Sequence, residues 1–205
     1  MIIPVKSSGK KSRLAAVLDD GEREEFAMLL LMDVLGELKK ARLLRSSRVV
    51  SPDGEILAAA ERAGANTVQE KEAAGFDTAV TRGLRGVRGR PDVLILPADL
   101  PLLEAWELQH LLRIRAEGFD VALAPARAFD GTNAMLFSSA ARVPLSYDDN
   151  SFWNHLSGAA LRGLSVWVCT EPGLIFDVDS PSDFDALARS GSRRPSAEFA
   201  RRVTR

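Results

Sequence analysis

Short apolar segments alternate with amphipathic helical segments along the first 116 residues of the chain. Residues 1–5, 46–51, 66–69 and 93–96 have the pattern of strands, and residues 21–41, 55–63, 76–84 and 104–116 have helical spacing. This alternation is typical of a parallel sheet that is covered by helices on both faces. The segment "VLIL" at residues 93–96 is wholly apolar, which predicts a strand at the centre of that sheet.

The pattern changes after residue 120, where four strand candidates surround a single convincing helix. The candidates are residues 120–125, 133–137, 164–169 and 174–179, and the helix spans residues 151–161. Strands with few helices between them favour antiparallel pairing, because a parallel pair needs a long crossover connection. The predicted fold is therefore α/β, with a mixed, mostly parallel sheet flanked by helices.

The last part of the chain predicts a closing helix followed by a tail. Ser180 is a good helix cap, with Pro181 at the first helical position and Asp183 at the third. We therefore expect a single domain over residues 1–189. Residues 190–205 contain five arginines and one acid, Glu198, without a strong apolar period. They predict a basic C-terminal tail, which is either solvated or a short helix docked on a partner.

Composition excludes several classes of protein. A net charge of −1 provides no general basic field for nucleic acid. The apolar run after Met1 ends at Pro4, unlike a signal peptide, and no later stretch approaches the roughly 20 apolar residues of a membrane span. We therefore expect a cytoplasmic protein. With Cys169 as the one cysteine and two histidines, no zinc set of Cys and His is available, so a metal would need carboxylates, which favours Mg²⁺.

The segment after the first predicted strand, "IPVKSSGKKSRL", holds four cations around one glycine. These are Lys6, Lys10, Lys11 and Arg13, with Gly9 among them. The spacing does not match the P-loop pattern, and a dinucleotide fingerprint needs three glycines at this turn. The loop therefore either binds phosphate through side-chain cations at the ligand-binding edge of the sheet, or is a solvated lysine-rich loop.

Three aspartates and two neutral polar residues occupy positions that suit a ligand site at this edge. Asp99 follows the most apolar strand, where a carboxylate holds Mg²⁺ or caps the turn before the next helix. Asp177 and Asp179 are two residues apart in a predicted strand, so their side chains point to one face; the alternative is a charged edge strand. The segment "DGTNA" offers the hydroxyl of Thr132 and the amide of Asn133, although its Asp-Gly pair is also typical of a hairpin turn.

Six motifs of the chain resemble, in the same order, those of the guanylyltransferases of coenzyme F420 biosynthesis, the 2-phospho-L-lactate guanylyltransferase family. They are "IPVKSSGKKSRL", "EREEFAMLLLMDVL", "PADLPLL", "DGTNAMLF", "NSFWNHL" and "FDVDSPSDF", and they span residues 2 to about 188. The resemblance implies a glycosyltransferase-A-like fold. It also implies transfer of GMP from GTP to the phosphate of a small phosphorylated acid, 2-phospho-L-lactate or phosphoenolpyruvate, with release of pyrophosphate.

The residues suit this chemistry. A phosphomonoester has a second pKa of about 6, so the acceptor is largely dianionic at neutral pH and needs no histidine base. Mg²⁺ and cationic side chains are needed instead, because two anionic substrates repel each other. The expected site residues are Lys11, Arg13 and Asp99 for catalysis; Pro4, Val5, Lys6, Lys11, Arg13 and Asp77 for the nucleotide; Thr132, Asn133 and Ser151 for the acceptor; and Asp99, Asp177 and Asp179 for Mg²⁺. The acceptor contacts of Thr132 and Ser151 are implied by the resemblance alone.

Two segments depart from the family's pattern. Where the family's "FG..SF..H" has glycine, this chain has Asp148, and Asp149 follows; two carboxylates do not suit an anionic acceptor unless they turn outward or bind metal. The family's "LN.A" reads "GFDTAV" here, and Asp77 either accepts hydrogen bonds from guanine or caps the following helix. His155 is expected to be a structural histidine on a helix.

Two alternatives stay open at the level of function. A guanylyl- or cytidylyltransferase of molybdenum-cofactor synthesis would use the same metal and cations, and a catalytically idle nucleotide-binding domain would also explain the acidic loop. A homodimer is plausible, and neither nucleic acid nor a membrane is expected as a partner.

Overall fold

The computed structural model describes residues 1–5, 12–71, 75–89, 91–141, 143–147 and 149–204, which contain a seven-stranded sheet in the order β3-β2-β1-β4-β6-β5-β7. The strands are β1 (Ile2–Pro4), β2 (Arg48–Ser51), β3 (Asn66–Gln69), β4 (Asp92–Ile95), β5 (Val121–Pro125), β6 (Thr132–Ser138) and β7 (Val166–Val168). Strands β3, β2, β1 and β4 are parallel, β6 is antiparallel to both of its neighbours, and β7 is parallel to β5. The predicted mixed, mostly parallel sheet is confirmed.

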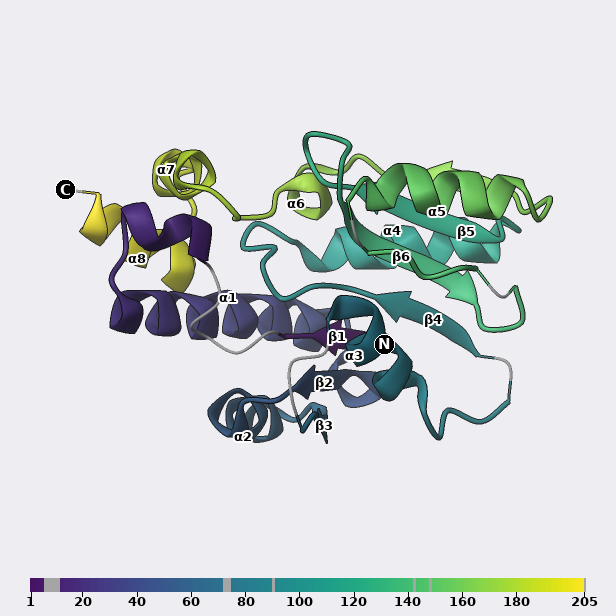
Figure 1. Ribbon diagram of the computed structural model, residues 1–205, viewed down its shortest axis with the longest axis horizontal. Coiled ribbons are helices and arrows are strands. Elements are labelled where there is room, and N and C mark those ends of the chain that lie inside the picture. The colour runs from purple at the N-terminus through teal and green to yellow at the C-terminus, as the bar shows by residue number, and fades with distance from the viewer. Residues whose placement is uncertain (6–11, 72–74, 90, 142, 148, 205) are drawn as a thin grey trace.

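Helices cover both faces of this sheet (Figure 1). They are α1 (Asp20–Lys40), α2 (Gly54–Ala63), α3 (Phe76–Leu84), α4 (Ala105–Ala116), α5 (Ser151–Ala160), α6 (Pro172–Ile175), α7 (Pro181–Arg189) and α8 (Pro195–Val203), with short 3₁₀ helices η2 (Ser12–Ala16) and η3 (Leu44–Ser46). Helices α1, α2 and α4 contribute to one core, and α3 and α5 contribute to another. Since successive strand residues point to opposite faces, Leu94 belongs to the first core, and Val93 and Ile95 belong to the second.

Local signals explain where the helices begin and how closely they pack. A capping box starts α1: the N–H of Glu22 donates to Asp19 Oδ1 at 2.8 Å, and the N–H of Asp19 donates to Glu22 Oε2 at 2.9 Å. Gly83 lets α3 approach β1, because a Cβ there would lie 2.6 Å from Ile2 Cγ2. This close approach places the first residue of α3, Phe76, at the edge of the sheet where β1 ends.

The strand predicted at residues 174–179 is wrong. Residues Pro172–Ile175 form the short helix α6, and residues 176–179 lie outside every strand. Gly173 is held against the start of α4, since its N–H donates to Glu107 Oε1 at 2.7 Å. The chain then runs over the sheet edge, where the N–H of Val178 donates to the carbonyl oxygen of Asp99 at 3.2 Å. This segment therefore pairs with a turn rather than with a strand. The other predicted strands and helices agree with the structure to within two residues.

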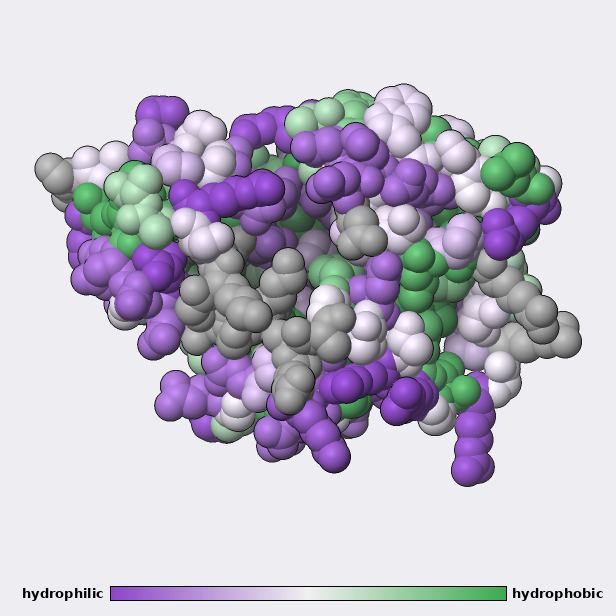
Figure 2. Space-filling view, in the orientation of Figure 1, coloured by the Kyte–Doolittle hydropathy of each residue, from purple (hydrophilic) through white to green (hydrophobic). Residues whose placement is uncertain are grey.

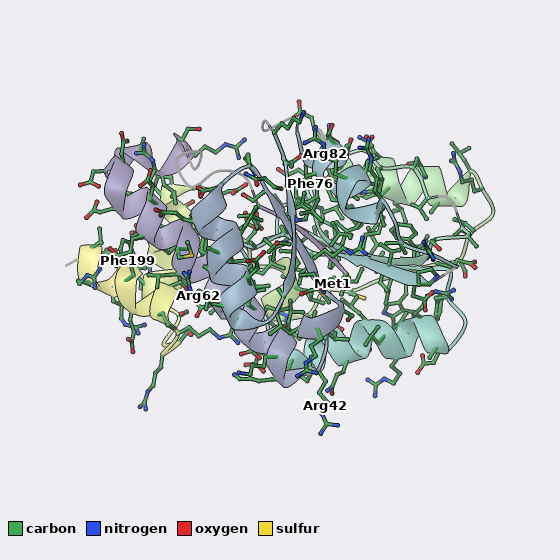
Figure 3. All side chains as sticks on the ribbon, turned by 90° about the horizontal axis from the view of Figure 1, so that it is seen from below. Met1, Arg42, Arg62, Phe76, Arg82 and Phe199 are labelled. Atoms are coloured by element: carbon green, nitrogen blue, oxygen red, sulfur yellow. The ribbon has the colours of Figure 1, made fainter. Side chains whose placement is uncertain are left out.

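The expected basic tail contains a packed helix. Helix α8 contacts α1 and α7, and the three helices share a third core cluster. The ring of Phe199 stacks on that of Phe26 at 5.5 Å between centroids, and α8 lies beside α1 where Phe199 is labelled in Figure 3. The Ser196 N–H donates to Asp33 Oδ2 at 3.2 Å. The expected boundary at residue 189 is therefore no break in the packing, because Ala and Phe side chains bury one face of this arginine-rich helix.

The surface is mostly hydrophilic on the face seen in Figure 2, where apolar residues form small separate areas. Among the residues that the structure describes, no helix is both long enough and apolar enough to span a membrane.

Candidate active site

A cavity of about 990 Å³ opens at the edge of the sheet where β1 and β4 end. Its lining includes Asp99, which follows β4. Strand β6 runs antiparallel to β4, so the start of β6 rather than its end reaches this edge. Thr132 and Asn133 therefore line the same cavity. Ligands of α/β proteins bind outside the carboxyl ends of parallel strands, and this cavity has that position.

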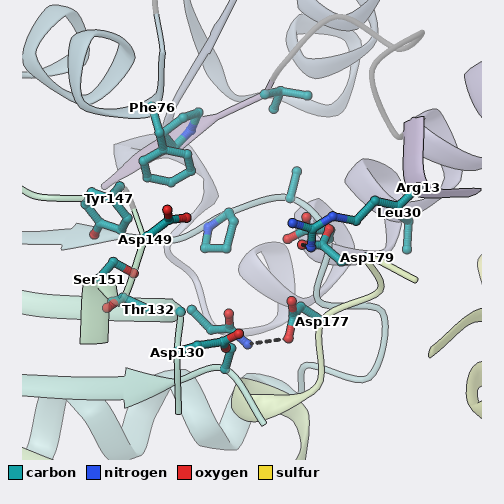
Figure 4. Close-up of a pocket in the computed structure, with 18 of the residues that line it drawn as sticks. Arg13, Leu30, Phe76, Asp130, Thr132, Tyr147, Asp149, Ser151, Asp177 and Asp179 are labelled. Atoms are coloured by element: carbon teal, nitrogen blue, oxygen red, sulfur yellow. Dashed lines mark hydrogen bonds and ion pairs between the residues drawn. The ribbon is translucent and has the colours of Figure 1, made fainter. Parts of the chain in front are cut away.

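The three aspartates predicted to hold Mg²⁺, Asp99, Asp177 and Asp179, all line the cavity. Figure 4 shows Asp177 and Asp179 at one end of it, together with Arg13. The pKa of Asp177 is raised to about 6, chiefly by burial and also by the negative charges of Asp99 and Asp179. Asn133 offsets part of this rise, because its Nδ2 donates to Asp177 Oδ1 at 3.2 Å. Arg13 Nη1 lies 4.0 Å from Asp179 Oδ2, and both side chains are at least half exposed, so a ligand can reach them.

The aspartates converge although the predicted strand that was to align them is wrong. Val178 is fully buried, whereas its neighbours Asp177 and Asp179 both line the cavity. An extended segment alternates its side chains even without a strand partner. The sequence therefore indicated the correct face for these two carboxylates.

The carboxylate oxygens are suitable ligands for Mg²⁺. Within the described residues, no three His, Cys, Asp or Glu side chains stand close enough together to form a ready-made metal site. Mg²⁺ commonly uses one or two carboxylates and completes its octahedron with waters and substrate phosphates. The pKa of Asp177 is raised mainly by burial and further by the charges of Asp99 and Asp179, and a divalent cation bound there would offset that repulsion. The donor set therefore fits an ion that arrives with a triphosphate.

The opposite end of the cavity carries hydroxyl groups and the start of α5. Ser151 is the first residue of α5 and is 3% exposed. No side chain among the described residues caps this helix, and its first turn contains no acid. The first N–H groups of a helix have no partner within the helix, and they favour an anion. Thr132 and Ser151 lie at this end in Figure 4, with Asp149 beside them.

Of the other residues predicted to bind the nucleotide, two line the cavity, two lie outside the described residues, and one is not part of the lining. Pro4 and Val5 line the cavity, as predicted for the nucleotide site. Lys6 and Lys11, like Asp148, lie outside the described residues. Asp77 is not part of the cavity lining; its Oδ1 accepts a hydrogen bond from the backbone N–H of Tyr147 at 3.1 Å. Gly75 rather than Asp77 precedes α3, so the helix-cap interpretation of Asp77 is wrong. A contact of Asp77 with guanine stays a prediction.

Two aromatic residues that we did not predict also line the cavity. Phe76 begins α3, and its ring lies 4.3 Å from that of Tyr147 between centroids. This contact joins α3 to the loop before α5. The only available signal was the aromatic position of the "FG..SF..H" pattern, which Tyr147 occupies. Asp130 lines the cavity too, at the start of the segment "DGTNA".

Comparison with known proteins identifies the family. The family described as guanylyl transferase CofC like matches residues 1–204. The chain belongs to this family. A phosphoenolpyruvate guanylyltransferase from Rubrobacter xylanophilus is 39% identical over 193 residues, covering 93% of each chain. A 2-phospho-L-lactate guanylyltransferase from Methanothermobacter thermautotrophicus is 32% identical and covers 98% of this chain and 89% of the relative. A 3-phospho-D-glycerate guanylyltransferase from Phenylobacterium zucineum is 33% identical, with coverages of 93% and 89%.

The fold is also shared with solved structures. A nucleotide-diphospho-sugar transferase from Desulfovibrio desulfuricans G20 superposes with a TM-score of 0.78 at 17% identity, covering 99% of this chain and 94% of the other. The glycosyltransferase-A-like fold that the motifs predicted is therefore confirmed, as is the resemblance to the family.

Proposed function

We propose that this chain is a guanylyltransferase of coenzyme F420 biosynthesis, which transfers GMP from GTP to the phosphate of a small phosphorylated acid and releases pyrophosphate. Membership of the family and the names of the relatives support GMP transfer. The observation that carries the proposal is the two-ended cavity. Asp99, Asp177 and Asp179 suit a magnesium–triphosphate at one end, and Thr132 and Ser151 suit an anion at the other.

The proposed reaction needs no protein base. A nonbridging oxygen of the acceptor phosphate attacks the α-phosphorus of GTP, and the bond from that phosphorus to the bridging oxygen of the β-phosphate breaks. The acceptor phosphate has a second pKa of about 6 and is largely dianionic at neutral pH, so no proton has to be removed. The barrier lies in bringing two anions together and in stabilising the charge on the leaving pyrophosphate.

The end of the cavity that Asp99, Asp177 and Asp179 line, the acidic end, would bind the nucleotide. Asp99, with Asp177 or Asp179, would hold Mg²⁺, which when bound polarises phosphate oxygens and neutralises developing charge. Arg13 would contact the triphosphate, and Lys6 and Lys11 extend this set by resemblance. Asn133 would act indirectly, since it donates to Asp177 and restricts the orientation of that carboxylate. A contact of Asp77 with guanine stays a prediction, and Asp77 Oδ1 already accepts a bond from the loop before α5.

The end of the cavity that Thr132 and Ser151 line, the hydroxyl-rich end, would hold the acceptor. The names of the relatives include three acceptors, phosphoenolpyruvate, 2-phospho-L-lactate and 3-phospho-D-glycerate, each of which combines a phosphate with a carboxylate. Ser151, Thr132 and the first N–H groups of α5 can each donate to such an anion. Phosphoenolpyruvate and 2-phospho-L-lactate are the acceptors we propose. Asp130 and Asp149, which also line the cavity, would disfavour any acceptor with further negative charge.

We propose that the enzyme works in the cytoplasm, because its nucleotide substrate GTP is available there. A homodimer remains part of the proposal, and sedimentation velocity of the purified protein would test it.

Pyrophosphate release tests the proposed reaction. The protein is incubated with Mg²⁺, one of the four common nucleoside triphosphates, and phosphoenolpyruvate, 2-phospho-L-lactate or 3-phosphoglycerate. We expect release with GTP and one of the acceptors, together with a new guanylylated product in the mass spectrum. A preference for CTP would instead favour the molybdenum-cofactor type of enzyme, and nucleotide binding without turnover would favour an idle domain.

A matched pair of variants tests the role of the acidic end. Asp99→Asn should lower kcat by about 100-fold or more, because a metal ligand is lost. Asp92→Asn lies at the start of the same strand, where the carboxylate pairs with Arg115 at 3.1 Å, and should stay close to the wild type. An Asp99→Asn protein with wild-type turnover would refute the proposed arrangement.

A further inference from the structure

His155 is buried on α5 and uses both of its ring nitrogens. Only 1% of the surface of His155 is exposed to solvent. Nε2 lies 3.0 Å from the backbone nitrogen of Ser146. Because a backbone N–H can only donate, Nε2 must accept this bond, and the proton of the neutral ring is on Nδ1. Nδ1 lies 2.9 Å from Thr132 Oγ1, so His155 donates to that hydroxyl.

The direction of this hydrogen bond determines what Thr132 can offer to a ligand. A hydroxyl group has one hydrogen and two acceptor lone pairs. With His155 as the donor, the hydrogen of the Thr132 hydroxyl remains for another acceptor, and the part of the chain that the structure describes supplies none. Thr132 lines the cavity, as does Ser151, which lies one turn before His155 on the same face of α5. Two hydroxyl donors therefore stand at the end proposed for the acceptor, where they would offset the charge of the neighbouring Asp149.

We propose that His155 is a positioning residue for the acceptor: its Nδ1–H holds the Thr132 hydroxyl so that this group donates to an anionic oxygen of the acceptor. This role rests on the proposed guanylyl transfer. It adds the residue that orients the Thr132 hydroxyl, which donates a hydrogen bond to the phosphorylated acid. Nε2 of the same ring anchors Ser146, and so it fixes the loop that leads into α5.

The contacts of His155 link it to the cavity rather than to the core alone. The ring of Tyr147, which lines the cavity, packs edge-on against His155 with 4.6 Å between centroids. Asn154, its neighbour in α5, donates to Ser146 Oγ at 3.2 Å and to the carbonyl oxygen of Asp149 at 3.1 Å. Burial also lowers the pKa of His155 to about 4, so the ring is neutral at neutral pH and the direction of the bond to Thr132 is maintained.

Two substitutions separate the functions of the two nitrogens. In His155→Gln the amide oxygen can replace Nε2 as the acceptor for Ser146, while the donor to Thr132 is lost. In His155→Asn the amide nitrogen lies near the position of Nδ1, which retains a donor for Thr132 and loses the acceptor for Ser146. We expect His155→Gln to lower kcat/KM for the acceptor about tenfold, the effect of one hydrogen bond, with the KM of GTP unchanged. His155→Asn should retain more of the acceptor kcat/KM.

A double-mutant cycle tests whether His155 acts through Thr132. Thr132→Val removes the hydroxyl, and Thr132→Ser is the control that keeps it. If the inference is right, adding His155→Gln to Thr132→Val causes no further loss of acceptor kcat/KM. Additive losses, or an equal rise in the KM of GTP, would overturn it and leave His155 a packing residue. Thermal unfolding of each variant shows which of them are folded.

A measurement on the wild type tests the role of His155 even if the variants do not fold. The chain has two histidines, so a ¹⁵N-histidine correlation spectrum contains two rings, which His110→Gln assigns. We expect the His155 ring to carry its proton on Nδ1 at neutral pH, and a proton on Nε2 would refute the inference. A wild type that releases no pyrophosphate with any acceptor would refute guanylyl transfer itself, whereas an active wild type with additive variants refutes only the role of His155.

Discussion

Acidification should destabilise the folded protein through His155. Burial lowers the pKa of this residue from its ordinary value of 6.5 to about 4. Above pH 6.5 the ring is neutral in both the folded and the unfolded state. Between pH 6.5 and 4 the unfolded state binds the extra proton, so the free energy of unfolding falls as the pH falls. A difference of about 2.5 pH units corresponds to a loss of about 3 kcal/mol by pH 4.

Other groups titrate in this range, so the effect has to be measured as a difference. The raised pKa of Asp177, about 6, has the opposite sign, because there the folded state binds the proton first. Tyr147 packs on the His155 ring, but burial raises its pKa well above its usual range, so it stays neutral throughout this interval. These contributions cancel when the wild type is compared with His155→Gln, whose side chain does not titrate. Urea unfolding followed by circular dichroism, from pH 7.5 to 4 at constant ionic strength, gives both curves.

The stability of the wild type relative to His155→Gln should decrease by about 3 kcal/mol between pH 6.5 and 4, with an unchanged m-value. The sign matters as much as the size, because a histidine stabilised in its charged form would give the opposite slope. Two curves that remain parallel over this range would show that the ring is not both neutral and buried. That result would also remove the basis for assigning the hydrogen bond to Thr132.

Three substitutions and one control test other parts of the structure. Gly173→Ala should destabilise the protein by about 3 kcal/mol or more in thermal unfolding, because a Cβ would collide with the backbone at Leu102 and Leu103 as well as with the Glu107 carboxylate. Gly36→Ala is its control, since nothing lies within 4 Å of that Cβ, and it should stabilise α1 by up to about 1 kcal/mol. Phe199→Ala should cost about 3–5 kcal/mol in urea unfolding, and a cost below about 1 kcal/mol would contradict the docking of α8. Ser151→Ala should raise the KM of the acceptor alone; an equal rise for GTP would place Ser151 outside the acceptor end.

Local periodicity predicted most of this fold, and the errors have physical causes. Residues 176–179 alternate apolar and acidic side chains as a strand does, but the segment bonds to the turn at Asp99 and pairs with no strand of the described chain. The pattern of side chains shows which residues share a face, but it does not show whether the backbone has a strand as its partner. For the tail, the sequence left a solvated segment and a docked short helix as alternatives. It could not decide between them, because small alanines and Phe199 supply the apolar face of α8, and that face is buried only against Phe26 of α1.

The site was predictable where side chains follow strand ends, and not where it depends on distant pairs. Asp99 and Thr132 follow or begin strands that neighbour each other in the sheet, so the topology alone brings them to one cavity. The bond between Asp77 and the Tyr147 backbone joins residues 70 positions apart, and no local pattern announces it. The pairing of His155 with Thr132 is similar: the sequence indicates a histidine on a helix, but not the hydroxyl that its Nδ1 faces.

The antiparallel strand β6 explains how one cavity can serve two anions. In a purely parallel sheet, every strand would end at this edge, and each would lead into a loop and a helix. Because β6 runs the other way between β4 and β5, its first residues, Thr132 and Asn133, reach the edge as part of the strand: Thr132 lies opposite Pro125, and Asn133 lies at the register shift beside it. Asn133 donates a hydrogen bond to Asp177 at the acidic end, and Thr132 is hydrogen-bonded to His155 at the hydroxyl-rich end. Adjacent residues of one strand thus separate the two ends, with no loop between them to absorb a shift. A change that moves β6 should therefore alter the use of both substrates together, whereas a change confined to His155 should alter the use of the acceptor alone.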